Sequence, residues 1–207
     1  MSIATSESAV RRPGRRPGAS REEVLQAALE RYLRGRRIDI RAIAAELGLG
    51  RATVYRWFGS REDLIGEVLL RAAQPLLERA RLEARGRGGR ALLDTFDRFN
   101  RSLAKARALR QFIDQEHDAA LRIIYAGDGR VQPGLVDRIV ELIEEEVDGG
   151  RYEPPVDPST LGYAIVKIAE AFLFSDTVAG VRGDVDRLRE VQAALLGVSP
   201  GRPRRRR

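Results

Sequence analysis

Apolar residues recur every three or four positions along most of the chain, which is the spacing of one face of an α-helix. The pattern is clear after Ser20, where Val24, Ala28 and Leu29 form a stripe that ends at Gly35. The letters SREE at the start of this stripe have the hydroxyl and acid spacing of a capping box. The first periodic segment is therefore predicted to be a helix.

The same periodicity predicts the other elements. A short helix follows Asp39, another covers 51–58, and a long one starts near Arg61 with a kink expected at Pro75. Further helices are expected over roughly 90–104, 107–126, 134–148, 157–180 and 184–197. No hairpin dipeptide lies between alternating apolar runs, so almost nothing indicates a strand. The sequence predicts an all-α protein of about nine helices.

The chain is expected to have four parts: a disordered basic arm over 1–19, a small three-helix unit over 20–65, a larger helical body over 66–198 and a disordered basic tail over 199–207. The net charge of +7 is unevenly spread, because residues 1–60 carry 12 arginines and 6 acidic residues, whereas 61–199 carry 20 basic and 24 acidic ones. A basic end on a mildly acidic body indicates that one end meets a polyanion, either nucleic acid or an anionic membrane. Arginines spread over solvated faces are the alternative explanation.

Several classes of function are disfavoured by composition. The absence of cysteine excludes disulfides, thiolate zinc sites and cysteine nucleophiles, and the single histidine, His117, argues against a histidine metal site. No Ser-His-Asp order and no phosphate-binding loop is present, so we expect no cofactor and no enzymatic activity. The start lacks the apolar core of a signal peptide and no stretch is apolar for about 18 residues, so the expectation is a cytoplasmic protein without a membrane partner.

The stretch from 38 to 65 predicts two short helices, joined by a glycine-bearing turn and followed at once by a third. This is the sequence form of a helix-turn-helix, whose second helix enters the major groove of double-stranded DNA. Val54 and Phe58 lie four residues apart on that helix and should face inward. The remaining side chains suit DNA, because arginine bonds guanine edges or phosphates and tyrosine can donate to a phosphate. Packing of Tyr55 and Trp57 against the body is the alternative.

The segment from 20 to 65 resembles the DNA-binding domain of the TetR/AcrR family of transcriptional regulators. The resemblance is carried by an IA…G helix, a tight turn, a YxxF pair and a restart of the S-[KR]-[ED] kind, here Ile43, Ala44, Gly48, Tyr55, Phe58, Ser60, Arg61, Glu62 and Leu64. It implies that Thr53 and Tyr55 lie in the groove, and that Trp57 and Arg61 contact the DNA backbone. The family often has serine where Gly50 stands and threonine where Asp39 stands, which weakens the case for the usual phosphate contact of the second helix.

The basic arm adds a second predicted DNA contact. Its sequence, RRPGRRPG, contains prolines and glycines that disfavour helix, and extended arginines of this kind fit a narrow minor groove. The basic tail follows the last helices, where we expect no DNA. The full set of predicted DNA-contacting residues is Arg15, Arg16, Arg41, Arg51, Ala52, Thr53, Tyr55, Arg56, Trp57 and Arg61.

The helix expected over 157–180 is apolar nearly all round, so it must be covered on both sides. A second copy of the chain is the simplest cover, and the family resemblance implies a dimer formed by the last two long helices. A central helix in a monomeric body is the alternative. The residues predicted for the interface are Leu161, Ile165, Ile168, Phe172, Leu188, Val191 and Leu195.

The family resemblance also implies a largely apolar pocket for a small-molecule effector in the body. The candidates to line it are Phe96, Phe99, Phe112, His117, Tyr125 and Tyr163, although ordinary core packing explains most of them equally well. The stretch YRWFGSREDLIGEV further resembles the QsdR-like subgroup, which implies a lactone or an acyl compound.

The function predicted from the sequence is a dimeric repressor that a small apolar ligand releases from a near-palindromic operator. The alternative is an architectural nucleic-acid-binding protein with little sequence specificity, in which the arginine segments dominate.

Overall fold

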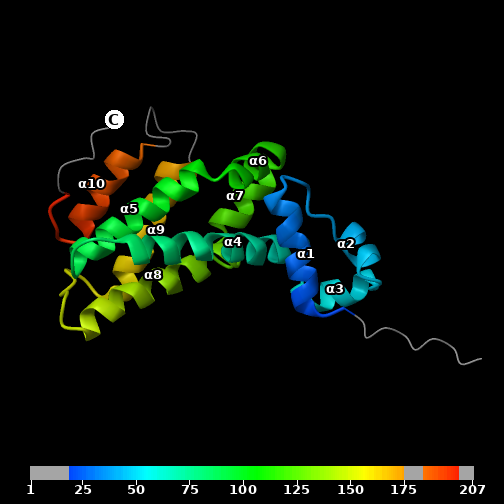
Figure 1. Ribbon diagram of the computed structural model, residues 1–207, viewed down its shortest axis with the longest axis horizontal. Helices are drawn as coiled ribbons and strands as arrows, with labels where there is room; N and C mark the ends of the chain where they lie inside the picture. The colour runs from blue at the N-terminus through cyan, green and yellow to red at the C-terminus, as the bar shows by residue number, and fades with distance from the viewer. Residues whose placement is uncertain (1–18, 175–183, 201–207) are drawn as a thin grey trace, which may run out of the picture.

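The structure, a computed structural model, describes residues 19–174 and 184–200, and within these ranges every regular element is a helix (Figure 1). The ten helices are α1 (Arg21–Leu33), α2 (Ile40–Glu46), α3 (Arg51–Phe58), α4 (Arg61–Glu83), α5 (Gly89–Lys105), α6 (Arg107–Gln115), α7 (His117–Tyr125), α8 (Val131–Asp148), α9 (Pro158–Phe174) and α10 (Val185–Leu195). The all-α prediction is confirmed. None of the described helices is long and apolar enough to cross a membrane.

Two expected boundaries differ from the structure. The helix expected over 107–126 is divided in two, because Glu116 has φ −134° and ψ 48° and so interrupts the helical backbone between α6 and α7. The helix expected over 157–180 is described as far as Phe174, and the rest of that range lies outside the described residues. Pro75 lies within α4.

Side-chain caps start the helices of the N-terminal end where the sequence predicts them. Ser20 and Glu23 form the capping box of α1, with each side chain bonded to the backbone N–H of the other residue. The Asp39 carboxylate accepts the first backbone N–H groups of α2, and the Ser60 hydroxyl accepts that of Asp63 in α4. Each such cap is worth about 1 kcal/mol, which helps short helices such as α2 to form.

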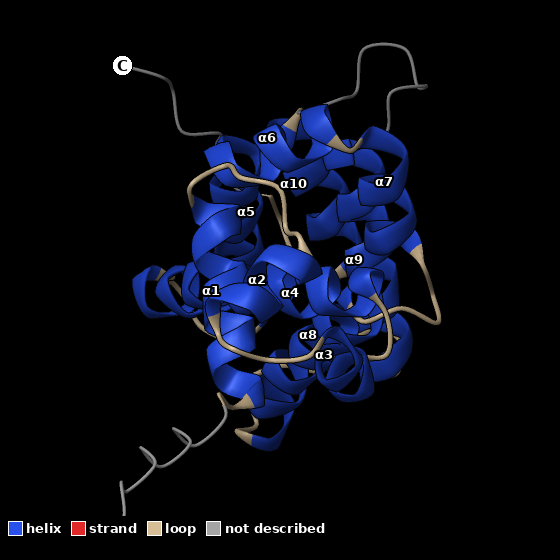
Figure 2. Ribbon diagram, turned by 90° about the vertical axis from the view of Figure 1, so that its right-hand side faces the viewer, coloured by secondary structure: helices blue, strands red, loops and turns tan. Residues whose placement is uncertain are grey.

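The helices α1, α2 and α3 form one end of the molecule, and α4 runs from them through its middle (Figure 1). At the opposite end α5 and α8 pack on the second half of α4, and α9 and α10 pack on α8, α5 and each other, with α6 and α7 between the two ends. Seen from the first end, α2 and α3 lie in front of the rest of the molecule (Figure 2). This three-helix end therefore presents a surface that the body does not cover.

The apolar core consists of two clusters. The first joins α1–α4 to α6 and α7, and it includes Val24, Phe58, Ile113 and Ile124. The second joins the later half of α4 to α5, α8, α9 and α10. The three-helix unit thus shares its core with α6 and α7. Because this core is close-packed, a displacement of α6 or α7 would shift the side chains of the three-helix unit that contact it.

Candidate DNA-binding surface and effector cavity

Helix α3 is anchored by its apolar side and leaves its polar side uncovered. Val54 and Phe58 are fully buried, as the spacing predicts, because they enter the first core cluster. Arg51, Tyr55 and Arg56 are exposed, and so is Ala52. Thr53 and Trp57 are half-buried, and Trp57 packs against the first cluster. The exposed side chains of α3 therefore include two guanidinium groups and a phenol on the uncovered end of the molecule.

The neighbouring helix α2 adds one cation to this end. Arg41 is exposed in its first turn, next to the Asp39 carboxylate that caps the helix through the backbone N–H of Arg41 at 2.7 Å. Gly50 caps α3 without a side-chain hydrogen bond. The predicted arm contacts, Arg15 and Arg16, lie outside the described residues.

Arg61 is placed differently from the sequence-based expectation. Its guanidinium donates to both carboxylate oxygens of Glu116 at 2.7 and 2.8 Å, and its Nε donates to the Ile38 carbonyl at 2.9 Å. The group therefore faces the junction of α6 and α7, and the predicted contact with DNA is replaced by an ion pair within the chain. The sequence could not show this pair because its members lie 55 residues apart.

The Arg61–Glu116 pair joins the three-helix unit to the body. A second guanidinium, that of Arg37, lies 3.5 Å from the same carboxylate, and Gln115 donates to the Gly35 carbonyl at 3.2 Å. The hydrogen bond from Arg61 holds the pKa of the Glu116 carboxyl below its usual value, against the opposing effect of burial. These contacts fix the loop between α1 and α2 and the start of α4 against α6 and α7.

An apolar cavity of about 300 Å³ lies between the two ends of the molecule. Its walls come from α1, from α4 to α9 and from the joint of α5 and α6. The polar residues among the described lining are Tyr32, Arg107 and Glu170, and the rest are apolar: Leu33, Leu69, Leu70, Ala72, Ala73, Leu76, Leu103, Ala106, Ala108, Leu109, Ile124, Val131, Leu135 and Phe174. A molecule bound there would contact α1 and α4 as well as the body.

The six residues predicted to line an effector pocket do not line this cavity. Phe96 and Phe99 border a smaller, adjoining space of only about 40 Å³, and Phe112 is part of the first core cluster. His117 and Tyr163 are exposed, and the Tyr125 hydroxyl donates to the Glu170 backbone carbonyl at 3.4 Å. These residues lie elsewhere because aromatic side chains at helical spacing pack into the core, while the cavity is bordered mainly by aliphatic side chains.

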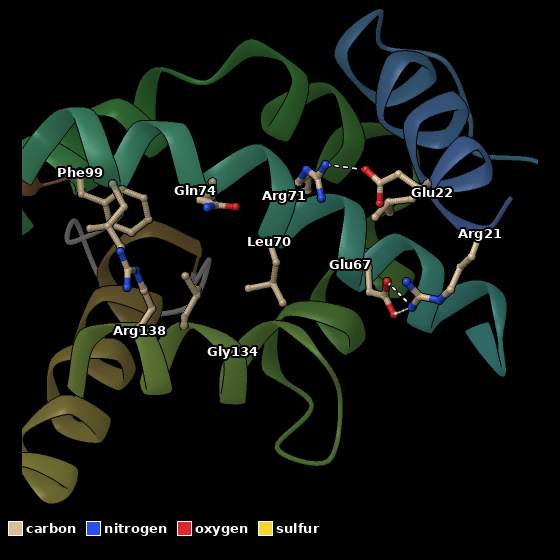
Figure 3. A pocket seen from close by; sticks show the side chains of 13 residues that line it. Arg21, Glu22, Glu67, Leu70, Arg71, Gln74, Phe99, Gly134 and Arg138 are labelled. Atoms are coloured by element: carbon tan, nitrogen blue, oxygen red, sulfur yellow. Dashed lines mark hydrogen bonds and ion pairs between the residues drawn. The ribbon is translucent and has the colours of Figure 1, made fainter. Parts of the chain in front are cut away.

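A larger groove of about 540 Å³ lies along α4, against α1 and α8, and shares Leu70, Ala73 and Leu135 with the cavity (Figure 3). Four of its charged residues are paired with one another, Arg21 with Glu67 and Arg71 with Glu22, and a fifth, Arg138, bonds Glu141 (Figure 3). Leu70 points across the groove toward Gly134, where a Cβ would come within 2.8 Å of it. This groove is charged and open, so the apolar cavity is the better candidate for an apolar effector.

The predicted dimer residues fall into two groups. Leu161, Ile165 and Leu188 are buried in their own protomer, with at most 2% of their surface exposed, so they cannot contact a second copy. This part of the prediction was wrong because α9 packs on α8 and α10, which cover one side of it. The other four, Ile168, Phe172, Val191 and Leu195, are half-buried and form i, i+4 pairs on α9 and α10.

Two family models match the chain. The one described as "Tetracyclin repressor-like, C-terminal domain" matches residues 87–197, more than half of the chain, and "Bacterial regulatory proteins, tetR family" matches residues 36–68. The chain belongs to the TetR family. The resemblance seen in the helix-turn-helix sequence is thereby confirmed, and so is the expectation of a DNA-binding regulator that is not an enzyme.

Solved structures of the TetR family resemble the whole fold. The transcriptional repressor QsdR of R. erythropolis is 28% identical, with a TM-score of 0.81 over 90% of this chain and 97% of that one. The repressor AlkX of Dietzia sp. strain DQ12-45-1b is 20% identical, with a TM-score of 0.58 over 86% and 96% of the two chains, and shares the fold. None of the curated proteins compared with the chain matches it.

One residue of the TetR-type DNA-binding end, Arg21, has a structural role that the sequence does not indicate. Arg21, the first residue of α1, bonds both oxygens of Glu67 at 2.5 and 2.6 Å, and its guanidinium carbon lies 4.4 Å from the centre of the Phe58 ring. It also donates to the Trp57 carbonyl at 3.4 Å. Arg21 therefore holds the start of α1 to the end of α3. Nothing in the sequence distinguishes it from the other arginines, because its partner lies 46 residues away.

Replacing Glu116 by glutamine should lower the free energy of unfolding at pH 7 by about 1–3 kcal/mol, because Arg61 would lose its charged acceptor in a half-buried site. The pKa of this carboxyl is lowered in the folded protein, so its contribution is complete above the ordinary value of 4.5 and is lost as the pH falls through the lowered value. The difference in the free energy of unfolding between wild type and E116Q should therefore become smaller below about pH 4.5. Urea unfolding at a series of pH values measures it.

The matched control for E116Q is Glu62→Gln, which changes an exposed carboxylate on α4. E62Q should differ from wild type by less than about 0.5 kcal/mol at pH 7. If E116Q loses no more stability than E62Q, the ion pair does not fasten the two parts of the protein together.

Proposed function

We propose that this TetR-family protein is a dimeric repressor whose α3 lies in the major groove of its operator. The observation that carries the proposal is the anchoring of α3, because Val54 and Phe58 hold it while the opposite side stays uncovered. An arginine on such a helix can bond a guanine edge, and a tyrosine can donate to a phosphate. The residues proposed to contact DNA are Arg41, Arg51, Ala52, Thr53, Tyr55, Arg56 and Trp57, with Arg15 and Arg16 of the arm.

The dimer is proposed to form through α9 and α10. Ile168 and Phe172 on α9, with Val191 and Leu195 on α10, form a half-buried apolar stripe that a second copy would cover. Covering the same stripe on both copies produces a two-fold interface. The two α3 helices would then meet half-sites of a near-palindrome, separated by about one turn of DNA or somewhat more.

Release from the operator is proposed to follow binding of a small molecule in the apolar cavity. Tyr32 and Leu33 of α1 and Leu69 of α4 line the cavity together with residues of α5–α9. A ligand there shifts the equilibrium only if its affinity differs between the DNA-bound and free conformations. The shared cavity wall supports such a difference, because the ligand would contact the three-helix unit and the body at once.

The experiment that tests this function compares an operator with a random duplex of the same length at one salt concentration. The operator would be selected from the DNA upstream of the gene for this protein. We expect the operator to bind at least about 10³-fold more tightly than the random duplex, as is typical of specific regulators. A ratio near one, with steep salt dependence for both duplexes, would support the architectural alternative instead.

A further inference from the structure

We propose that the apolar cavity takes an uncharged molecule of about ten heavy atoms, with an apolar body and a hydrogen-bond-donating head that binds the Glu170 carboxylate. The inference rests on the proposed function, because it names the class of ligand that would act at that site. It also excludes ligands with an anionic head, since such a head would be repelled by the same carboxylate.

The size of the ligand follows from the volume of the cavity. A space of about 300 Å³ corresponds to about ten water volumes, and a methylene group is of similar size. The apolar lining favours binding of an apolar molecule of this size, since each methylene that it buries contributes about 0.8 kcal/mol in transfer free energy. An alkyl chain of about eight carbons with a small head therefore matches the space.

The position of the head follows from Glu170, which borders both the cavity and the adjoining space of about 40 Å³. Only 4% of the surface of this residue is exposed. Gln132 donates to its two carboxylate oxygens at 3.2 and 3.3 Å, and Lys167 donates to one of them at 3.0 Å. Two carboxylate oxygens can accept about four hydrogen bonds, so these donors leave room for one from a ligand.

The charges around Glu170 favour a ligand head that is a neutral hydrogen-bond donor. Lys167 already neutralises the carboxylate, so an ammonium head would be dehydrated without gaining a new counter-charge, whereas a hydroxyl or an amide N–H costs less to dehydrate. Burial raises the pKa of Glu170 against the opposing effects of Lys167 and Gln132, because the group is almost fully removed from water. A hydrogen bond in such a place is stronger than at the surface.

Arg107 offers the opposite arrangement, in which an anionic head would lie at the cavity's outer side with its tail inside. Arg107 is exposed, so water and salt screen its charge, and a carboxylate beside it gains little. Glu170 is fixed by two donors in a dry site. We therefore assign orientation of the ligand to Glu170 and not to Arg107.

The test uses three probes of nearly equal size on the full-length protein: octan-1-ol, octyl methyl ether and octanoate. Isothermal titration at neutral pH should show octan-1-ol binding about tenfold or more tightly than either of the others, since the ether has no donor and octanoate brings a second negative charge. Ala72→Phe, which fills the cavity from α4, should remove binding of all three probes. Persistent binding to A72F would place the probes elsewhere and overturn the inference.

Two further variants separate the possible anchors. Glu170→Gln keeps the shape of the side chain but removes its charge. It should therefore weaken the binding of octan-1-ol several-fold and strengthen the binding of octanoate. Arg107→Gln, the matched control, should leave the order of the three probes unchanged. If octanoate binds wild type as tightly as octan-1-ol, or if R107Q weakens octanoate while E170Q changes nothing, the assignment to Glu170 is wrong.

Failure of this inference can be distinguished from failure of the proposed function. The probe order and its response to E170Q are measured without DNA, so they test the cavity alone. Release of the operator by octan-1-ol is measured separately, by fluorescence anisotropy of the protein–DNA complex. Selective binding without release would leave the ligand class intact and contradict ligand-controlled repression.

Discussion

Replacing Arg51 by alanine is expected to weaken binding to the operator by about 10- to 100-fold, and replacing Tyr55 by alanine should have an effect of similar size. Both side chains are exposed on α3, beside the buried Val54 that anchors the helix. Their removal therefore deletes contacts with DNA and leaves the core unchanged. The free energy of unfolding should change by less than about 0.5 kcal/mol for either variant.

Fluorescence anisotropy with operator and random duplexes separates the roles of the two side chains. If Arg51 bonds a base edge, R51A should lose affinity for the operator and much less for the random duplex. If Tyr55 bonds a phosphate, Y55A should weaken both duplexes alike. Arg79→Ala, at an exposed position in the later part of α4, is the control. Unchanged operator affinity in both R51A and Y55A would contradict the placement of α3 in the major groove.

Placing an aspartate in the apolar stripe is expected to separate the dimer. Ile168→Asp on α9, or Val191→Asp on α10, would bring two equivalent charges into the interface without partners, at a cost of several kcal/mol. The variants should be monomeric at micromolar concentration. Their operator affinity should fall by about 100-fold or more, since the second α3 would no longer be held close to its half-site. Sedimentation equilibrium and anisotropy measure the two effects.

A control for these charges is available on the same chain. Leu82 is 86% exposed near the end of α4, so Leu82→Asp should change neither the oligomeric state nor the operator affinity. Circular dichroism checks that I168D and V191D remain helical, as expected for positions outside the fully buried core. A dimeric I168D and a dimeric V191D would together contradict an interface through α9 and α10.

Local sequence signals predicted the DNA-binding end well. Helix periodicity, the caps at Ser20 and Asp39, and the four-residue spacing of Val54 and Phe58 depend on neighbours in the chain. Interactions of this range act within one or two helical turns, so the sequence contains all of their partners. The family resemblance added the groove assignment for α3, which periodicity alone does not give.

The role of individual side chains in the body could not be predicted in the same way. An apolar residue on a helix can face the core, a cavity or a second copy, and periodicity does not distinguish these environments. Leu161 and Ile165 are in the protomer core, whereas Ile168, on the same helix, is only half-buried. Which side of α9 is covered depends on the packing of α8 and α10, and these contacts are long-range.

By itself, the sequence determined the helical class, the position of the helix-turn-helix and the outward side of α3, because short-range spacing and capping fix them. Only the tertiary structure decided that Arg61 bonds Glu116, that Arg21 bonds Glu67, and that Glu170 borders the apolar cavity. The physical reason is distance along the chain. A charge or an apolar side chain chooses its partner from all segments that the fold brings near, and that choice is made only when the helices pack.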